Sequence, residues 1–274
     1  MSRLQETARR TASLIGRESW IIRNLRPAYE SLLDWSGDGK GIPWEINGVT
    51  YRIDPRQRHR LGQNYDAPVA AFLRQHVKPG SLCFDVGANV GVYVLQFAHW
   101  SAPTGQVIAF EPNPAARAIL EQHVSMNQLT ERVRIVPAAV SDANCEQVLY
   151  AAEADGMSRL GAPNRSLAGK TGEIVVPVLT LDEYCTSEAL QPDWLLIDIE
   201  GFEIAALAGA RKLIQSRRTQ LGIVVEMHPD VWSSANTTRV RAEDLLAELG
   251  LGAVPLTGQS DPLGNHGIVH LAYV

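Results

Sequence analysis

The feature that most constrains the fold is a repeated alternation of short apolar runs with amphipathic stretches from about residue 81 onward. The apolar runs, expected to be strands, are Ser81–Val86, Gln106–Phe110, Val133–Pro137, Leu195–Ile199 and Leu221–Met227. The stretches with helical spacing are Val90–Trp100, Pro114–Asn127, Ile204–Gln215 and Arg239–Leu249. Continuous apolar strands alternating with helices are typical of a mostly parallel sheet covered on both faces. The sequence therefore predicts a Rossmann-like α/β fold.

Two further segments complete this domain. The tail contains two apparent strands, Ala253–Leu256 and Gly267–Val274, with no helix between them, which predicts an antiparallel pair at one edge of the sheet. Between the third and fourth strands lies Ser141–Pro192, a long irregular section with short strands at Val148–Ala151 and Glu173–Val178. Long loops in compact domains are usually functional. We expect this section to be an insertion beside the active site.

The opening segment has a different character. Residues 1 to about 35 show helical spacing of apolar residues, and Trp44–Ile53 alternates around Asn47-Gly48, a signal for a two-residue hairpin turn. Such a segment has too little apolar surface to fold alone. We predict an appendage over residues 1–66, serving as a substrate lid or as a contact in a homodimer, and a main domain over residues 67–274.

Composition and charge exclude several classes of protein. The 274-residue chain has a net charge of -5, whereas a general nucleic-acid binder normally has a basic surplus. The three cysteines are far apart and show no zinc-binding spacing. No apolar run has the length of a membrane span, and charged residues interrupt any signal-peptide pattern at the N-terminus. We expect a cytoplasmic protein.

The most informative segment joins the first strand to its helix. Asp85 stands at the strand end, and the segment continues as Gly87, Ala88, Asn89, Val90 and Gly91. This is where open α/β sheets bind ligands. The two glycines permit a tight turn and close packing of the helix against the strand. Their G-x-x-x-G spacing differs from the dinucleotide fingerprint, which accommodates a pyrophosphate. S-adenosylmethionine has no phosphate but carries a cationic sulfonium, so an acid at this point suits it.

The second strand ends in a further acidic group, Glu111-Pro112-Asn113. A carboxylate at this place accepts hydrogen bonds from both ribose hydroxyls of a nucleoside. Two glycines alone would indicate only a strand-to-helix turn. Together with Asp85 and Glu111, they predict a nucleoside cofactor, with Ser141 and Asp198 as additional contacts. An NAD-binding oxidoreductase is the alternative, which the missing third glycine disfavours.

Acidic residues also gather where the fourth and fifth strands end. Asp198, Glu200 and Glu203 follow the fourth strand, and Glu226 and His228 end the fifth. By the two-residue period of a strand, Asp198 and Glu200 share one side, as do Glu226 and His228. Glu203 and Glu200 have an alternative interpretation as caps of the following helix.

At this point the chain resembles a known family, the FkbM-type methyltransferases. The resemblance rests on Asp85-Val-Gly-Ala-Asn-Val-Gly91, Glu111-Pro-Asn113 and Ile197-Asp-Ile-Glu-Gly-Phe-Glu203, and it covers residues from about 79 to 228. It implies the class I methyltransferase sheet of seven strands with the last antiparallel. It also implies methyl transfer from S-adenosylmethionine, with S-adenosylhomocysteine as product, usually to an oxygen of a sugar, lipid or secondary metabolite. One departure is Asp66, where such proteins often have glutamate.

An alcohol acceptor is a weak nucleophile, so a base must remove its proton as the new bond forms. Our candidates for catalysis are Asp198, His228 and Glu226. The same three residues could hold Mg²⁺, but magnesium prefers oxygen ligands and the histidine counts against it. We therefore expect metal-independent O-methylation of a small hydroxylated molecule. Further residues are candidates for lining the acceptor pocket: Tyr65, Met157, Arg159, Glu200 and Trp232.

Two other functions are compatible with the same motifs. The motifs describe the cofactor and not the acceptor, so an N- or C-methyltransferase on the same fold fits them as well. A binding protein that retains the cofactor pocket without catalysis is a further alternative. The identity of the acceptor is not encoded in any of these motifs.

Overall fold

The computed structural model describes residues 30, 40–58, 60–152, 158–161 and 171–274. The chain divides into two compact units, residues 1–65 and residues 66–274. The predicted helices over residues 1 to about 35 lie outside the described residues, apart from Glu30. The role of the opening segment as a lid or as a dimer contact stays a prediction.

The described part of the first unit is built on a hairpin. Strand β1 (Ile42–Ile46) pairs antiparallel with β2 (Val49–Ile53). The two turn residues, Asn47 and Gly48, have φ angles of 49° and 81°. Positive φ at both positions matches the type I′ turn expected from Asn-Gly, so the predicted hairpin is confirmed.

The second unit contains a seven-stranded sheet with the order β12-β13-β11-β10-β3-β4-β5. Its members are β3 (Leu82–Val86), β4 (Gln106–Phe110), β5 (Val133–Val136), β10 (Trp194–Ile197), β11 (Gly222–Met227), β12 (Leu251–Pro255) and β13 (Gly267–Tyr273). Strand β13 lies antiparallel between β11 and β12, and the run from β11 to β5 is parallel throughout. The predicted fold class, a mostly parallel sheet with an antiparallel last strand, is confirmed.

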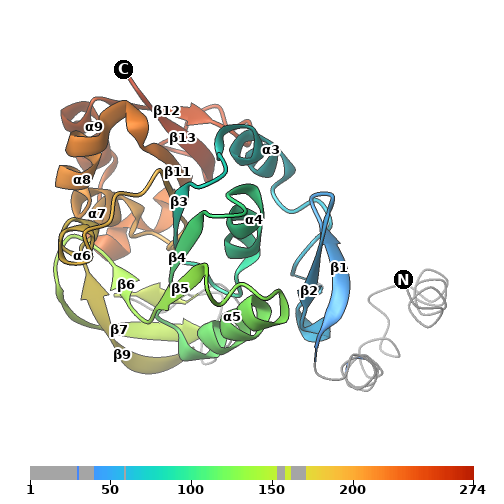
Figure 1. Cartoon of the computed structure of the whole chain (residues 1–274). Helices are drawn as coiled ribbons and strands as arrows, with labels where there is room; N and C mark the ends of the chain where they lie inside the picture. Colours follow the sequence, from blue (N-terminus) through green and yellow to red (C-terminus); the bar gives the residue numbers. More distant parts are fainter. Residues whose placement is uncertain (1–29, 31–39, 59, 153–157, 162–170) are drawn as a thin grey trace. The chain divides into compact units, whose positions relative to one another are not determined.

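Helices cover both faces of this sheet (Figure 1). On one face lie α3 (Ala67–His76), α4 (Val92–Trp100) and α5 (Pro114–Met126). On the other face lie α6 (Leu181–Ser187), α7 (Glu203–Ala208), α8 (Arg211–Arg217) and α9 (Arg239–Leu249). The central strands are therefore buried on both sides, which explains why their sequences are continuously apolar. The side chains of Phe84, Leu195 and Ile197 are fully buried in this core.

One predicted helix is wrong in its extent. The stretch Ile204–Gln215 forms two helices, α7 and α8, which are separated at Gly209. A Cβ atom added at Gly209 would lie 2.0 Å from the carbonyl oxygen of Ser141. The backbone of residue 209 thus packs directly on another backbone segment, an approach that requires glycine. Helical spacing in the sequence does not reveal such a contact.

The section Ser141–Pro192 is also more regular than predicted. A second sheet, with the order β6-β9-β7-β8, is formed by β6 (Ala139–Val140), β7 (Cys145–Ala152), β8 (Arg159–Leu160) and β9 (Thr171–Leu179). Its apolar face packs on Phe202 and Ala205. These two residues belong to the segment that follows β10, so the insertion supports the start of α7.

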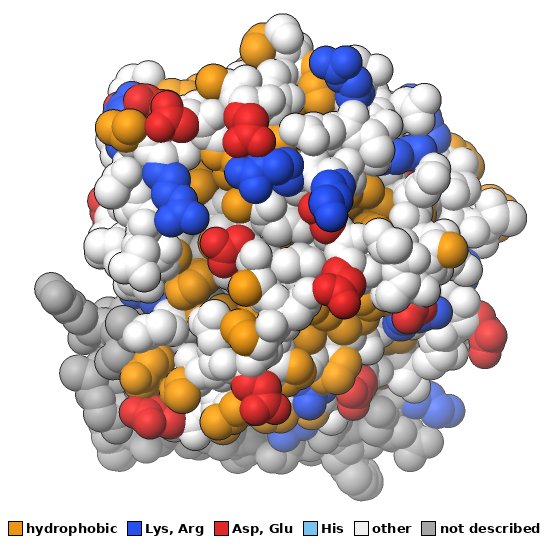
Figure 2. Space-filling view, turned by 90° about the vertical axis from the view of Figure 1, so that its left-hand side faces the viewer, with side chains coloured by type: hydrophobic (Ala, Val, Ile, Leu, Met, Phe, Trp, Pro, Cys, Tyr) orange, Lys and Arg blue, Asp and Glu red, His pale blue; other side chains and the backbone are white. Residues whose placement is uncertain are grey.

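The surface of the second unit carries charges of both signs. Figure 2 shows acidic and basic side chains interspersed on the face that carries α6, α8 and α9. Several form exposed ion pairs, such as Arg211–Glu248 and Arg134–Glu188, which contribute little to stability. Within the described ranges, no helix is both long and apolar enough to cross a bilayer.

The break between α7 and α8 generates a stability prediction. Gly209→Ala should lower the free energy of unfolding by about 1–3 kcal/mol, because its methyl group collides with the Ser141 carbonyl. The matched control is Gly172→Ala in β9, where an added Cβ meets nothing within 4 Å. Urea denaturation of both variants measures the difference. If both variants had the same free energy of unfolding, the backbone around Ser141 would have moved to accept the methyl group without loss of stability.

Candidate active site

The glycine loop, residues 87–91 after β3, contacts the carboxyl ends of two neighbouring strands. Gly87 has a φ of 90°, and a Cβ atom there would lie 1.8 Å from the carbonyl oxygen of Asp198. The backbone N–H groups of Gly87 and Ala88 both donate to the Phe110 carbonyl at 3.0 Å. Gly87 therefore permits the turn that brings the ends of β3, β4 and β10 together, and Asp198 lies directly against this loop.

The second glycine of the motif also lies against a neighbouring helix. Gly91, with a φ of 92°, precedes α4, and a Cβ there would lie 2.4 Å from Cδ1 of Leu120. Leu120 belongs to α5, so Gly91 permits close packing of the loop against a neighbouring helix. The sequence motif did not predict this contact.

Asp85 is the acid at the end of β3. It is 2% exposed, and the backbone of Val94 hydrogen-bonds to it. Its Oδ2 atom is buried without a hydrogen-bond partner among the described residues. Burial, followed by repulsion from Glu111, raises the pKa of Asp85 to about 8. A buried carboxyl oxygen without a donor is costly, and a ligand that supplies a donor or a positive charge would relieve that cost.

Glu111 holds the loop from the neighbouring strand. Its Oε2 accepts from the Asn89 backbone at 2.7 Å, and its Oε1 accepts from the Asn113 backbone at 2.8 Å. Burial raises the pKa of Glu111 to about 7, opposed by these two hydrogen bonds. A carboxylate has about four acceptor sites, so two remain for a ligand. Asn89 adds a buried Oδ1 that also has no partner within the described structure.

The remaining predicted cofactor residues have mainly local contacts. Pro112 is half-buried, and its carbonyl accepts from Arg117. Asn113 caps α5 by accepting from the Ala115 backbone, and its Nδ2 donates to Ser158 at 3.0 Å. Ser141 is buried, and its backbone packs on Gly209 and bonds to Leu179. The roles of these residues toward a cofactor stay predictions.

A buried glutamate organises the ends of β10 and β11. The Glu203 side chain is 0% exposed, and its two oxygens accept three hydrogen bonds. Oε1 accepts from the Gly201 backbone at 2.6 Å and from Nδ1 of His228 at 2.8 Å, and Oε2 accepts from the Trp232 indole at 2.9 Å. Glu203 does begin α7, as the capping interpretation expected, but it also fixes the segment after β11.

His228 is oriented by this glutamate. Because Nδ1 is held by Glu203, Nε2 faces outward and lies 3.8 Å from Glu226 Oε1 and 4.0 Å from Asp198 Oδ1. The surrounding acids, Glu203 foremost, outweigh the effect of burial and raise the pKa of His228 to about 9. The pKa of Asp198 is also raised, by burial and then by Glu226, against the opposing effect of His228. Asp198, Glu226 and His228 are thus brought together, as their sequence positions predicted.

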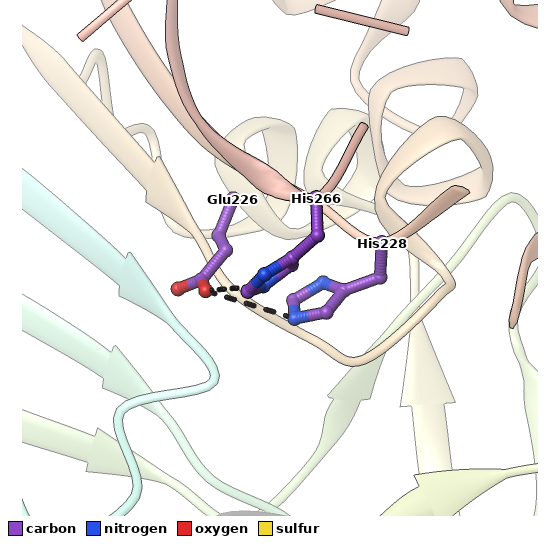
Figure 3. A group of neighbouring side chains, drawn as sticks. All are labelled: Glu226, His228 and His266. Carbon is purple, nitrogen blue, oxygen red and sulfur yellow. Dashed lines mark hydrogen bonds and ion pairs between the residues drawn. The ribbon is translucent and has the colours of Figure 1, made fainter. Parts of the chain in front are cut away.

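The structure adds a residue that the sequence did not indicate. In the antiparallel pairing of β11 with β13, Met227 lies opposite Gly267. The next residues along, His228 and His266, have ring centroids 4.7 Å apart, and Nε2 of His266 donates to Glu226 Oε1 at 2.8 Å. Figure 3 shows both rings directed toward the Glu226 carboxylate. The sequence of the tail predicts only two strands with no helix between them, and no motif there indicates His266.

Asp66 interacts electrostatically with this group. It precedes α3 in a left-handed conformation, with a φ of 41°, and its Oδ2 accepts from the Tyr93 hydroxyl at 3.2 Å. Burial raises the pKa of Asp66, Glu226 raises it further, and His266 opposes this effect. The residue noted as a departure from the family pattern therefore belongs to the same acidic surroundings.

The relation between Asp198 and Glu200 differs from the prediction. Strand β10 ends at Ile197, and Glu200 and Gly201 have φ angles of 53° and 107°. The two-residue period therefore does not extend to Glu200. Its carboxylate instead pairs with Arg159 of the second sheet at 3.2 Å.

Two of the other predicted pocket residues, Trp232 and Arg159, are buried in the second unit. Trp232 is buried and donates to Glu203, so its indole N–H is already engaged. Arg159 is buried beside Glu200, and its Nε has no hydrogen-bond partner in the described structure. Tyr65 ends the first unit, where its carbonyl accepts from Asn47. Met157 lies outside the described residues.

Comparison with known proteins agrees with this arrangement. Residues 85–250 match the methyltransferase FkbM domain. The chain is 30% identical over 186 residues to the 31-O-demethyl-FK506 methyltransferase FkbM of Streptomyces tacrolimicus, covering 57% of this chain and 70% of that protein.

Two solved methyltransferase structures are similar to this chain in part of their length. A methyltransferase FkbM from Methylobacillus flagellatus has a TM-score of 0.45 and 14% identity over 70% of this chain, which spans only 43% of that longer protein. A SAM-dependent O-methyltransferase from Thermotoga maritima has a TM-score of 0.41 and 14% identity, covering 76% of this chain and 64% of that one. The motifs at the sheet edge and the domain match together place this chain in the FkbM family of S-adenosylmethionine-dependent methyltransferases.

Proposed function

We propose that this enzyme methylates a hydroxyl oxygen of a small molecule, such as a sugar or a secondary metabolite. The observation that carries the proposal is the contact between the glycine loop and Asp198, since Gly87 has no room for a Cβ beside the Asp198 carbonyl. The glycine loop and the group of Asp198, Glu226 and His228 are therefore neighbours at one edge of the sheet. The name of the relative from Streptomyces tacrolimicus, a 31-O-demethyl compound methyltransferase, supports oxygen as the acceptor atom.

The residues at β3 and β4 fit S-adenosylmethionine. When bound, this cofactor supplies a methyl group activated by its sulfonium. Asp85 offers a buried oxygen without a donor, and Glu111 retains acceptor sites for ribose hydroxyls. Their pKa values, raised by burial, show that two carboxylates here are poorly compensated by the protein alone. A cationic ligand with hydroxyl groups supplies what both acids lack.

Asp198 is the best candidate to receive the acceptor's proton. Its side chain is 36% exposed, whereas His228 is 12% exposed and has Nδ1 bound to Glu203. Asp198 would take the hydroxyl proton of the acceptor, while bound S-adenosylmethionine would supply the methyl group and leave without it. The products are a methyl ether and S-adenosylhomocysteine. Placing the acceptor against an already activated carbon supplies much of the rate.

The role of Asp198 can be separated from cofactor binding. Asp198→Asn should lower kcat for methylation of the acceptor hydroxyl at least about 100-fold, because the amide cannot take the proton. Its affinity for S-adenosylmethionine should change much less. Mass-spectrometric turnover and titration calorimetry measure the two effects, with the exposed Asp244→Asn on α9 as control. Unchanged turnover in Asp198→Asn would contradict the assignment, and binding of NAD in place of S-adenosylmethionine would overturn the proposed function.

The buried carboxyl of Asp85 predicts how strongly the cofactor stabilises the protein at different pH values. Because Asp85 has a pKa of about 8 when folded and an ordinary value near 3.8, the folded protein holds the proton more tightly. The stability of the cofactor-free protein therefore falls as pH rises from about 4 to about 8, by at most about 1.4 kcal/mol per pH unit from this residue. A cationic ligand favours the ionised form and offsets this loss.

The increase in Tm caused by S-adenosylmethionine should accordingly be larger at pH 8 than at pH 6. Asp85→Asn removes the titrating group, so its own Tm without cofactor should decline less over the same range. Thermal unfolding at both pH values, with and without cofactor, checks this expectation. A wild-type Tm increase that is larger at pH 6 would contradict it.

A further inference from the structure

The group formed by Glu226, His228 and His266 has the composition of a metal site. The ligand atoms that these residues offer all lie within 4.8 Å of one another. Two of the separations are shorter, at 2.8 Å from His266 Nε2 to Glu226 Oε1 and 3.8 Å from His228 Nε2 to the same oxygen. Ligands of one tetrahedral Zn²⁺ ion, each about 2.0–2.1 Å from it, lie roughly 3.3 Å apart. Modest side-chain rotations would therefore bring the three atoms around one ion.

The hydrogen bond behind His228 is the second observation. Metal-binding histidines usually donate their other ring N–H to a carboxylate or carbonyl, which fixes the ring and its tautomer. Here Nδ1 of His228 is bound at 2.8 Å to Glu203, whose side chain is wholly buried. Glu203 is held in turn by Gly201 and Trp232. This buried network leaves Nε2 of His228 directed toward Glu226, as Figure 3 shows.

The charges around the group favour a cation. Asp198 and Glu203 lie beside His228, and Asp66 is close enough to Glu226 and His266 to interact with them electrostatically. Four carboxylates with only two imidazoles leave a surplus of negative charge, which a divalent ion would balance. Two nitrogen ligands and one oxygen suit Zn²⁺, Co²⁺ or a similar transition metal better than Mg²⁺, which prefers oxygen and water.

We propose that Glu226 Oε1, His228 Nε2 and His266 Nε2 bind one divalent transition-metal ion beside Asp198. The proposal departs from the expected set of Asp198, Glu226 and His228, since His266 takes the third ligand position and Asp198 stays outside the ligand set. Three protein ligands leave a coordination position open. This part rests on the proposed function: the open position would take the acceptor hydroxyl oxygen, with Asp198 next to it to receive the proton.

The test measures metal binding directly on the full-length, untagged protein. After treatment with a chelator and dialysis, the protein is titrated with Co²⁺, whose visible absorption reports nitrogen coordination, and then with competing Zn²⁺ or Mg²⁺. We expect one Co²⁺ per chain, displaced by Zn²⁺ and not by equimolar Mg²⁺. Failure to bind Co²⁺ or Zn²⁺ at micromolar concentrations would overturn the proposal, as would displacement by equimolar Mg²⁺.

Variants show whether the ion lies at this group. His266→Gln and Glu226→Gln should each weaken Co²⁺ binding at least about 100-fold, and Glu203→Gln about 10–100-fold through the orientation of His228. The matched control is His270→Gln in β13, the strand that begins directly after His266. This variant should bind as the wild type does, because His270 packs on Phe72 instead. Equal Co²⁺ affinity in His266→Gln and wild type would refute the site.

The metal test and the proposed function fail separately. Co²⁺ binding is measured without cofactor or acceptor, so its loss in a variant does not depend on methyl transfer. Calorimetry with S-adenosylmethionine on His266→Gln provides the reverse control, and we expect its affinity for the cofactor to stay within about threefold of the wild type. Absence of cofactor binding by the wild type would overturn the proposed function while leaving the metal result intact.

Discussion

The arrangement of the functional edge depends on one buried carboxylate. Glu203 receives hydrogen bonds from the loop after β10 and from two side chains that follow β11. A fully buried carboxylate is tolerated only when its oxygens are satisfied, so the three donors cannot be lost independently. The loop at Gly201, the ring of His228 and the indole of Trp232 are consequently fixed relative to one another.

A second constraint is steric and acts at Gly87. The Asp198 carbonyl occupies the space where any other residue would place its Cβ, so the glycine loop and the end of β10 are in direct backbone contact. The two constraints meet at the segment 198–203, whose ends are Asp198 and Glu203. One short segment thus connects the acids at β3 and β4 with the group at β11 and β13. Phe202, within this segment, packs against the apolar face of the second sheet.

The electrostatics of the edge differ between its two halves. At β3 and β4, Asp85 and Glu111 are buried and accept hydrogen bonds from backbone N–H groups, and burial raises the pKa of both carboxyls although Arg117 lies near Glu111. At β10 and β11, a similar surplus of acids surrounds two histidines. Both halves are therefore arranged to receive positive charge, the first from a cationic cofactor and the second from a proton or a metal ion. Such uncompensated charge costs stability and is typical of functional sites.

The sequence alone determined the sheet, the glycine loop, the strand-end acids and the family, because each depends on local spacing or on residues next to one another in the chain. The sequence predicted strands within β7 and β9 but not their pairing into a second sheet, and it did not predict the α7–α8 break or the contact of Gly91 with Leu120, because each of these depends on contacts between distant parts of the chain. Only the tertiary structure brought His266 to Glu226 and His228, and Asp66 to the same surroundings. The reason is that β13 inserts antiparallel between β11 and β12, and no periodicity in the sequence specifies which strand a later strand will pair with.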